Sequence, residues 1–208
     1  MDRESFSRRK LFWPTLFIVA IAYLISGCAL IANRPLEVSL TPKAPTVPIN
    51  IGRGTIIYLS VLDQRSEKSL GSRVDEAAWQ RLGWGEFHGT ISAVENIVGL
   101  VQNSLTAGLA SLGFETLTAP EPSVSKLEVA LRSLKYWEEG RAVNGLIEAK
   151  LYKSDRLLYE NSYSYAFQCR SVFLPFDRSW FETNFNAALS DLMGQLLADL
   201  ELLAKLKS

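Results

Sequence analysis

Hydrophobic residues recur along this chain at the two spacings that distinguish helices from strands. Residues 94–112 and residues 179–203 repeat apolar side chains about every 3.6 positions, the period of a helix that buries one face. The second apolar stripe includes Leu200 and continues without a break to residue 203, which predicts a single helix. A Ser-x-x-Glu capping box opens each of these segments, which predicts where the helices begin: Ser92 with Glu95, and Ser179 with Glu182.

The remaining apolar segments predict strands. Residues 55–62 are rich in β-branched and aromatic side chains, and residues 114–117 form a shorter run of the same kind. Three long alternating segments at 126–137, 142–153 and 157–170 are separated by short polar turns, which favours an antiparallel meander. The predicted fold class is therefore α+β: a mostly antiparallel sheet with two amphipathic helices packed on one face.

One group of tyrosines in the last strand shares a face. Tyr159, Tyr163 and Tyr165 are separated by even numbers of residues and so point the same way. We expect them to pack beneath a helix, with stacking on a glycan as the alternative.

Composition excludes several function classes. The chain has 22 basic and 22 acidic residues, and removing residues 1–27 leaves 18 basic and 20 acidic residues, a net charge of −2. Binders of nucleic acid are usually strongly basic, so a nucleic-acid partner is not expected. A single histidine argues against a histidine-based metal site or catalytic triad, and we expect no metal, no cofactor and no enzymatic activity.

The N-terminus carries the most specific chemistry. Basic residues at 8–10 precede an uncharged apolar run at 11–25, and the small residues Ser26 and Gly27 lead to Cys28. This order is typical of a secretory signal peptide covering residues 1–27. The segment that ends in Ile25, Ser26, Gly27 and Cys28 resembles the lipobox of bacterial lipoproteins, which implies that the Cys28 thiol is joined to diacylglycerol and its new N-terminus acylated, with palmitate as a typical chain.

Two alternative interpretations of this N-terminal segment stay open, and one residue in it bears on which membrane holds the protein. Residues 11–32 are long enough for an uncleaved transmembrane helix, and the adjacent arginines fit a twin-arginine export signal as well as the general secretory route. Ala29 follows Cys28 where lipoproteins retained in the inner membrane often carry aspartate. The resemblance therefore implies an outer-membrane anchor facing the periplasm, with the inner membrane as the alternative.

The lipid-bearing residue is followed by a proline-rich stretch. Residues 28–54 contain Pro35, Pro42, Pro45 and Pro48, which favour an extended tether, with a short edge strand at residues 36–40. We therefore predict three parts: a signal peptide at 1–27, a lipidated tether at 28–54, and a periplasmic domain at 55–208.

A resemblance to a known family rests on the segment after the first buried strand. Residues 58–70 read YLSVLDQRSEKSL, and together with the lipobox and the order of elements they resemble the YajG family of bacterial envelope lipoproteins. The resemblance implies a class of protein and a location more than an activity.

Two groups of residues are candidates for binding. Asp63 and Arg65, at the end of the first strand, form either a ligand-binding pair or a turn in which the carboxylate caps the backbone. Trp79, Trp84 and Phe87 lie in a glycine-rich stretch, as either a partner-binding patch or a packed lid.

The expected function is a membrane-anchored lipoprotein that acts as a non-enzymatic binding or assembly module of the cell envelope. Its expected partners are the membrane, through the lipid, and an envelope protein or peptidoglycan. The alternatives are an enzyme acting on cell-wall glycan, or a structural subunit of an outer-membrane assembly.

Overall fold

The structure is a computed structural model of the chain, and it describes residues 35–43, 51–74, 88–137, 141–169 and 177–207. One compact unit, Leu36–Ser72 with Ile91–Ser208, contains the core. Within the second unit, Met1–Pro35 with Arg73–Thr90, the described residues are Pro35 and the strand ends from 73 to 74 and from 88 to 90. In chain order, the described elements are β1 (Leu36–Val38), β2 (Ile56–Asp63), β3 (Gly71–Val74), β4 (His88–Ala93), α3 (Ile97–Ser111), β5 (Glu115–Leu117), β6 (Ser125–Trp137), β7 (Ala142–Lys153), β8 (Arg156–Gln168), α4 (Arg178–Leu197) and α5 (Leu200–Lys207).

The strands form one mixed sheet around β6. One edge of β6 pairs with β7, and β7 pairs with β8, both antiparallel as the short turns predicted. The other edge pairs with β2 and then, at Gly71 opposite Tyr136, with β3, both parallel. Beyond them lie β5, parallel to β2, and β4 with β1.

The expectation of a mostly antiparallel sheet is therefore wrong, although the α+β class is confirmed. The physical reason is two crossover connections. Helix α3 returns the chain to the same end of the sheet, so that β5 runs parallel to β2, and the connection 118–124 then crosses β2, so that β6 runs parallel to it as well. The local pattern of each strand predicted the strand and not its partner.

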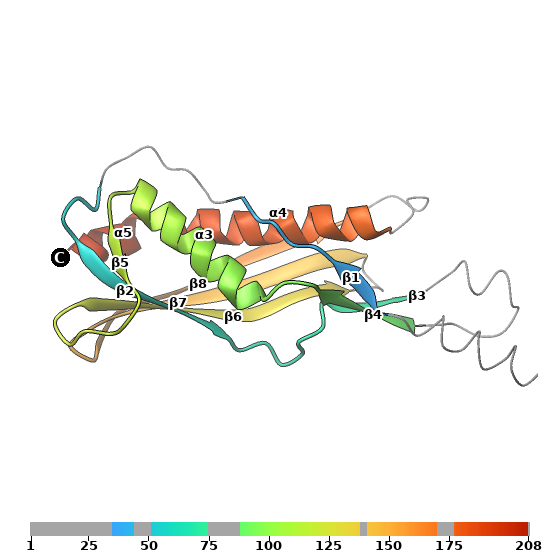
Figure 1. Cartoon of the computed structure of the whole chain (residues 1–208), viewed down its shortest axis with the longest axis horizontal. Helices are drawn as coiled ribbons and strands as arrows, with labels where there is room; N and C mark the ends of the chain where they lie inside the picture. Colours follow the sequence, from blue (N-terminus) through green and yellow to red (C-terminus); the bar gives the residue numbers. More distant parts are fainter. Residues whose placement is uncertain (1–34, 44–50, 75–87, 138–140, 170–176, 208) are drawn as a thin grey trace, which may run out of the picture. The chain divides into compact units, whose positions relative to one another are not determined.

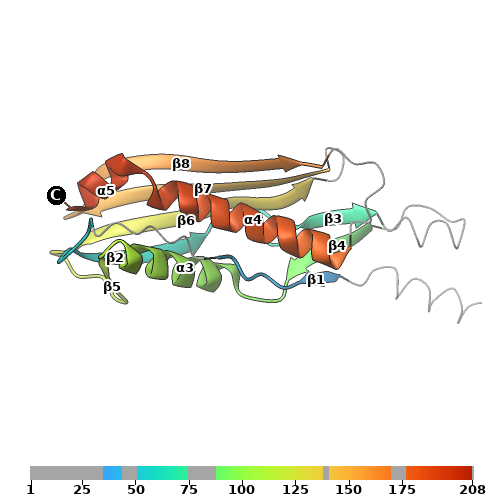
Figure 2. The ribbon, with the colours of Figure 1, turned by 90° about the horizontal axis from the view of Figure 1, so that it is seen from above.

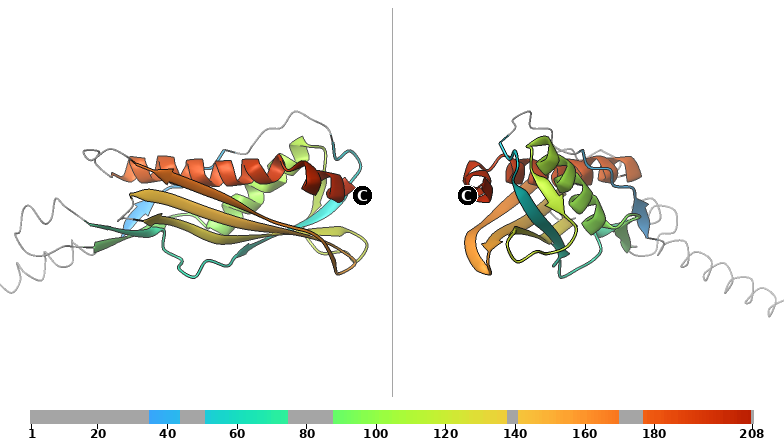
Figure 3. Two further views of the ribbon diagram at one scale, coloured as in Figure 1. Left: turned by 180° about the vertical axis from the view of Figure 1, so that it is seen from behind. Right: turned by 60° about the vertical axis from the view of Figure 1, so that its left-hand side comes forward.

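The helices cover one face of the sheet, as predicted, but there are three of them in the described chain (Figure 1). Helix α4 packs along β7 and β8, while α3 packs on β2 and on α4. Seen from above, α3 and α4 lie over different parts of the sheet, and α5 continues from α4 toward β8 (Figure 2). The views from behind and from the side show the long β6–β7–β8 strands beneath this helical layer (Figure 3).

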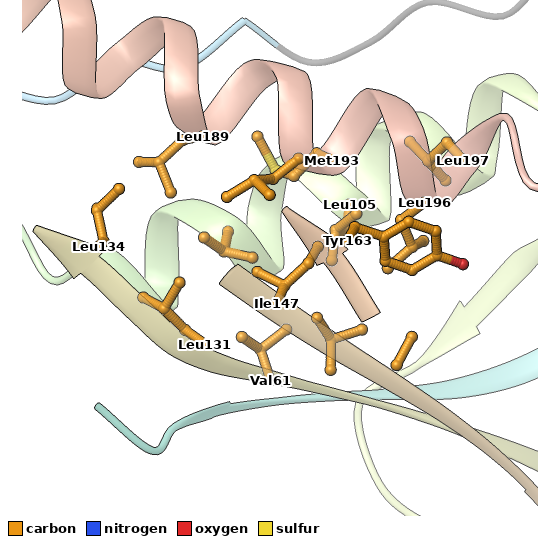
Figure 4. Packing of buried hydrophobic residues seen from close by; sticks show 14 of the residues in the cluster. Val61, Leu105, Leu131, Leu134, Ile147, Tyr163, Leu189, Met193, Leu196 and Leu197 are labelled. Atoms are coloured by element: carbon orange, nitrogen blue, oxygen red, sulfur yellow. The ribbon is translucent and has the colours of Figure 1, made fainter. Parts of the chain in front are cut away.

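The core fills the space between sheet and helices. Leu131 and Leu134 of β6 and Ile147 of β7 face Leu189 and Met193 of α4 (Figure 4), and all five are almost completely buried. Burying each of these side chains contributes about 1.5–3 kcal/mol relative to exposing it.

A glycine lets α4 come close to β7. A Cβ added at Gly145 would lie 2.7 Å from Cδ1 of Leu192, closer than carbon atoms can pack. The Leu192 side chain of α4 therefore packs directly on the β7 backbone at this point, and a larger residue at position 145 would have to displace it.

The capping boxes did not predict the helix starts: the N-cap of α3 lies four residues after the predicted N-cap Ser92, and that of α4 lies two residues before the predicted N-cap Ser179. The N-cap of α3 is Asn96, whose side chain accepts from the N–H groups of Val98 and Gly99, and the N-cap of α4 is Asp177. The carboxylates of Glu95 and Glu182 instead bind the two residues that follow β1. Glu95 accepts from the Ser39 hydroxyl at 2.6 Å and the Leu40 N–H at 2.8 Å, and Glu182 accepts from the Ser39 N–H at 2.8 Å.

The short edge strand predicted near residue 36 is present as β1. Val38 and Leu40 are fully buried, and the chain beyond them continues along α4 with hydrogen bonds from Thr41 N–H to Asn186 and from Lys43 N–H to Ser190. This part of the proline-rich segment is packed on the folded unit.

The second helical stripe breaks where the sequence pattern continues. Helix α4 ends at Leu197 and α5 begins at Leu200, whose side chain is 76% exposed although the pattern placed it in the core. Asp199 occupies the break and caps α5 by accepting from the N–H groups of Glu201 and Leu202.

Candidate functional site

The predicted pair Asp63 and Arg65 lies where β2 leaves the sheet. Both carboxylate oxygens of Asp63 accept from the guanidinium, at 3.0 Å from Nε and 2.9 Å from Nη2, and the Arg65 N–H donates to the same carboxylate at 3.2 Å. The Arg65 side chain is 6% exposed and that of Asp63 is 21% exposed. The hydrogen bonds from Arg65 hold the pKa of Asp63 well below its usual range.

Further ion pairs tie down the segment around this pair. The Lys68 ammonium lies 3.1 Å from the Asp63 carboxylate, and Lys135 of β6 lies 2.9 Å from Glu67. The backbone leaves β6 after the bond from Gln64 N–H to Leu131 and rejoins it where Tyr136 N–H donates to Leu70. These ion pairs therefore fix the connection at residues 64–70, through which the chain passes from β2 to β3 along the same edge of β6.

This geometry favours the structural role for Asp63 and Arg65 that was one of the two predicted alternatives. The carboxylate is occupied by the turn and by two cations, and the guanidinium is buried. Within the described part of the chain, Nη1 of Arg65 has no acceptor, so Asp63 holds this buried charge.

The described chain also contains a pocket that the sequence did not predict. It has a volume of about 800 Å³, within the range of ligand-binding cavities, and is formed by β2, β6, β7 and the loops beside them. Its lining residues are Tyr58, Pro120, Glu121, Pro122, Val124, Lys126, Glu128, Tyr152, Ser154 and Asp155.

The position of the pocket follows from the alternation of side chains in the strands. Ile57, Leu59 and Leu127 are buried beneath the helices, so Tyr58 and Lys126 between them point to the opposite, open face. The helices therefore leave the pocket floor uncovered.

The topology supplies the walls. Strands β5 and β6 flank β2 and both run parallel to it, so the connection 118–124 must cross β2 to pass from one side to the other. This connection and the turn between β7 and β8 lie at the same end of the sheet (Figure 3), and both line the pocket. Ser154 and Asp155 have φ of 48° and 63°, as in the tight hairpin turns that need two left-handed residues.

A row of three side chains crosses the pocket floor. Tyr58 of β2 is opposite Lys126 of β6, which is opposite Tyr152 of β7. All three are half-buried. The Lys126 ammonium lies 2.7 Å from the Glu128 carboxylate and 5.8 Å from the centre of the Tyr152 ring. The hydrogen bond to Glu128, against the effect of desolvation, raises the pKa of Lys126.

The open face beyond the pocket is charged. Glu148 of β7 binds Arg132 at 2.6 Å and Lys150 at 2.7 Å, and Lys150 also binds Glu160 of β8 at 3.0 Å. The hydrogen bonds from Lys150 and Arg132 lower the pKa of Glu148 to about 2. These paired charges form a solvated surface beside the pocket.

The predicted packing of the tyrosines is confirmed for two of the three. Tyr159 and Tyr163 are buried, and both hydroxyls donate to the Asp199 carboxylate at the start of α5. Tyr165 is partly buried against the same core. The buried Tyr159 and Tyr163 are therefore not available to stack on a glycan.

The remaining predicted site residues lie outside the described residues. They are Cys28, Trp79, Trp84 and Phe87. The described residues contain no helix long and apolar enough to cross a membrane, and the predicted alternative span at 11–32 is not among them. Within the same residues there is no group of three or more acidic, histidine or cysteine side chains arranged to hold a metal ion.

Comparison with known proteins shows what fold this is. No family model and no curated protein matches the sequence. Among solved structures, protein XCC0632 from Xanthomonas campestris, of family DUF330, matches with a TM-score of 0.57 and 13% identity over 81% of this chain and 96% of that chain. The chain therefore has the α+β fold of a DUF330 protein.

Two further structures match with lower scores. An uncharacterized protein has a TM-score of 0.47 and 14% identity over 79% of this chain and 96% of that chain. Lipoprotein GNA1162 from Neisseria meningitidis has a TM-score of 0.34 and 11% identity over 68% of this chain and 97% of that chain.

Proposed function

We propose that the protein is a lipid-anchored lipoprotein of the bacterial envelope that acts as a non-enzymatic binding module, with the pocket on the open face of the sheet as its binding site. The observation that carries this proposal is the pocket itself. It combines two tyrosines with four charged side chains on a face that no described helix covers.

The anchor is supported by the N-terminal sequence. The basic residues, the apolar run and the Ser26-Gly27-Cys28 ending together favour lipidation of Cys28. Ala29 favours the outer membrane, and residues 58–70 favour relationship to the YajG-like lipoproteins. Two or three acyl chains would bind the protein stably to a membrane.

A binding role fits the lining better than catalysis does. Glu128 is held in an ion pair with Lys126, and Glu121 and Asp155 lie on exposed loops. A glycan-cleaving enzyme needs a pair of carboxylates held at a fixed separation on either side of the bond. The three carboxylates of the pocket keep that alternative open to experiment: incubating the lipoprotein with isolated peptidoglycan should release no reducing ends, and sustained release would favour the enzyme.

Site-specific photo-crosslinking in the bacterium that encodes the protein tests the binding role. A photoreactive phenylalanine derivative at Glu121, on the exposed rim of the pocket, should form a discrete adduct with an envelope component. The matched control is the same residue at Ala107, which is exposed on α3 on the other side of the sheet.

The comparison between the two positions decides the proposal. An adduct at position 121 that is absent at position 107 supports the pocket as the binding site. No adduct at position 121, or the same adduct at both positions, would overturn it.

A further inference from the structure

We infer that this pocket binds an uncharged oligosaccharide, with one sugar ring on Tyr58 and another on Tyr152; the inference rests on the proposed binding function of the same site. Three independent features support it: the spacing of the two tyrosines, the charge of the lining and the rigidity of the walls.

The two tyrosines are separated by one strand. Because Tyr58, Lys126 and Tyr152 are in register on adjacent strands, the tyrosines are two interstrand spacings apart, about 10 Å. Such a separation suits two linked pyranose rings, each of which has an apolar face of C–H groups that packs on an aromatic ring. A single flat ligand would leave one of the tyrosines without a partner.

The charges of the lining disfavour an anionic ligand. The lining has three carboxylates, Glu121, Glu128 and Asp155, and one ammonium, Lys126, a net charge of −2. The ammonium is already bound by Glu128 at 2.7 Å. A phosphate or a uronic acid would therefore meet net repulsion, whereas sugar hydroxyls can donate to the carboxylates.

The same row disfavours a cationic ligand at the centre of the floor. The Lys126 ammonium lies 5.8 Å from the centre of the Tyr152 ring, so a ligand cation bound at this ring would lie close to an existing positive charge. A second cation there would be repelled by the first. The charges of the pocket therefore favour a ligand that is polar but uncharged.

The walls are shaped before a ligand arrives. Pro120 and Pro122 have fixed φ angles, and the turn at Ser154 and Asp155 is a tight hairpin turn. A preformed pocket loses little conformational entropy on binding. Its volume of about 800 Å³ accommodates a short oligosaccharide.

Calorimetric titration of the intact mature lipoprotein in detergent micelles tests the inference. The probe is the uncharged tetramer of β-1,4-linked N-acetylglucosamine, and the comparison ligands are the tetramer of galacturonic acid and spermidine. We expect saturable binding of the uncharged probe, weakened about tenfold by Tyr58→Ala or Tyr152→Ala.

Two controls keep a folding defect apart from a binding defect. Tyr58→Phe and Tyr152→Phe keep the ring and should retain most of the affinity. Trp137→Ala removes an aromatic side chain that is 51% exposed at the far end of β6, outside the pocket, and should leave binding unchanged.

The outcomes separate this inference from the function on which it rests. Binding of galacturonate or spermidine more tightly than the uncharged tetramer, or no binding of any of the three, would overturn the oligosaccharide. If the adduct at position 121 still forms in that case, the pocket remains a binding site for another ligand; if the adduct is also absent, the proposed function fails with it.

Discussion

Asp63 and Arg65 show how one buried charge organises the end of a strand. The guanidinium is almost fully buried, and the Asp63 carboxylate is its acceptor among the described residues. A buried ion pair need not stabilise a protein relative to apolar side chains, but removing one partner leaves a charge without compensation. The two residues should therefore respond very differently to single and to double substitution.

Asp63→Ala should lower the free energy of unfolding by about 3–5 kcal/mol, because it leaves the buried Arg65 charge unpaired. The double variant Asp63→Ala with Arg65→Met should be more stable than Asp63→Ala alone, since methionine removes that charge while keeping an unbranched apolar chain. Urea unfolding of the wild type and of these two variants measures both differences in unfolding free energy.

Lys68→Ala is the matched control, because it removes a cation from the same carboxylate at a side chain that is 63% exposed. Its effect should stay within about 0.5 kcal/mol. A double variant less stable than Asp63→Ala would show that the pair acts through something other than compensation of the buried charge.

At the scale of elements, Asp199 divides one apolar stripe into two helices. Burial raises its pKa, but hydrogen bonds from Tyr159, the Leu202 N–H and Tyr163 outweigh burial and lower the pKa to about 2. The carboxylate thus caps α5 and holds it on β8. The sequence predicted one continuous helix, because an acidic residue between apolar ones resembles any exposed helical position.

Asp199→Asn should keep the cap but lose the charge, costing about 1 kcal/mol of unfolding free energy near neutral pH, and Asp199→Ala should cost about 2–3 kcal/mol because it also loses the cap. The folded pKa lies below the unfolded value of 3.8, so the charge stabilises fully above pH 4, and this contribution is lost as the pH falls through 2. Urea unfolding of the wild type and Asp199→Asn between pH 2 and pH 7 measures the difference. A difference that stays constant over this range would contradict the role of the charge.

The sequence predicted the positions of helices and strands better than it predicted which strands pair with each other. The period of apolar residues located β2, α3 and the three strands of the meander, because each pattern is local. The parallel partners of β2 depend on how the chain crosses the sheet, which no local pattern records. The capping boxes failed for the same reason: Glu95 and Glu182 bind the distant residue Ser39 and not their own helix ends.

The pocket was missed for a related reason. Tyr58, Lys126 and Tyr152 come from three strands far apart in the sequence, and only the register of the sheet brings them into one row. One signal was present, since each residue has the opposite parity to the buried side chains beside it. Parity places a side chain on the open face and does not tell which side chains of that face are neighbours.

At the scale of the whole molecule, the folded unit reaches almost to the proposed anchor. Val38 and Leu40 are fully buried, and Leu36 begins β1. If Cys28 carries the lipid, seven residues separate it from Leu36, and the eight steps along the chain span at most about 29 Å. The proposed anchor would thus keep the folded unit close to the membrane surface, within reach of cell-wall glycan or of neighbouring envelope proteins.

The anchor itself gives the last prediction, and the chain provides its own control. Cys28→Ala should abolish incorporation of labelled palmitate, leave the signal peptide uncleaved and increase the apparent mass, because only a thiol can accept the diacylglycerol that must precede cleavage. Cys169→Ala removes the other cysteine, half-buried just after β8, and should be labelled and processed like the wild type. Metabolic labelling followed by electrophoresis and sedimentation of membranes reads all three outcomes together. A Cys28→Ala protein that is still labelled and shortened would refute the lipoprotein, whereas an unlabelled wild type that stays full-length in the membrane fraction would favour the uncleaved span at residues 11–32.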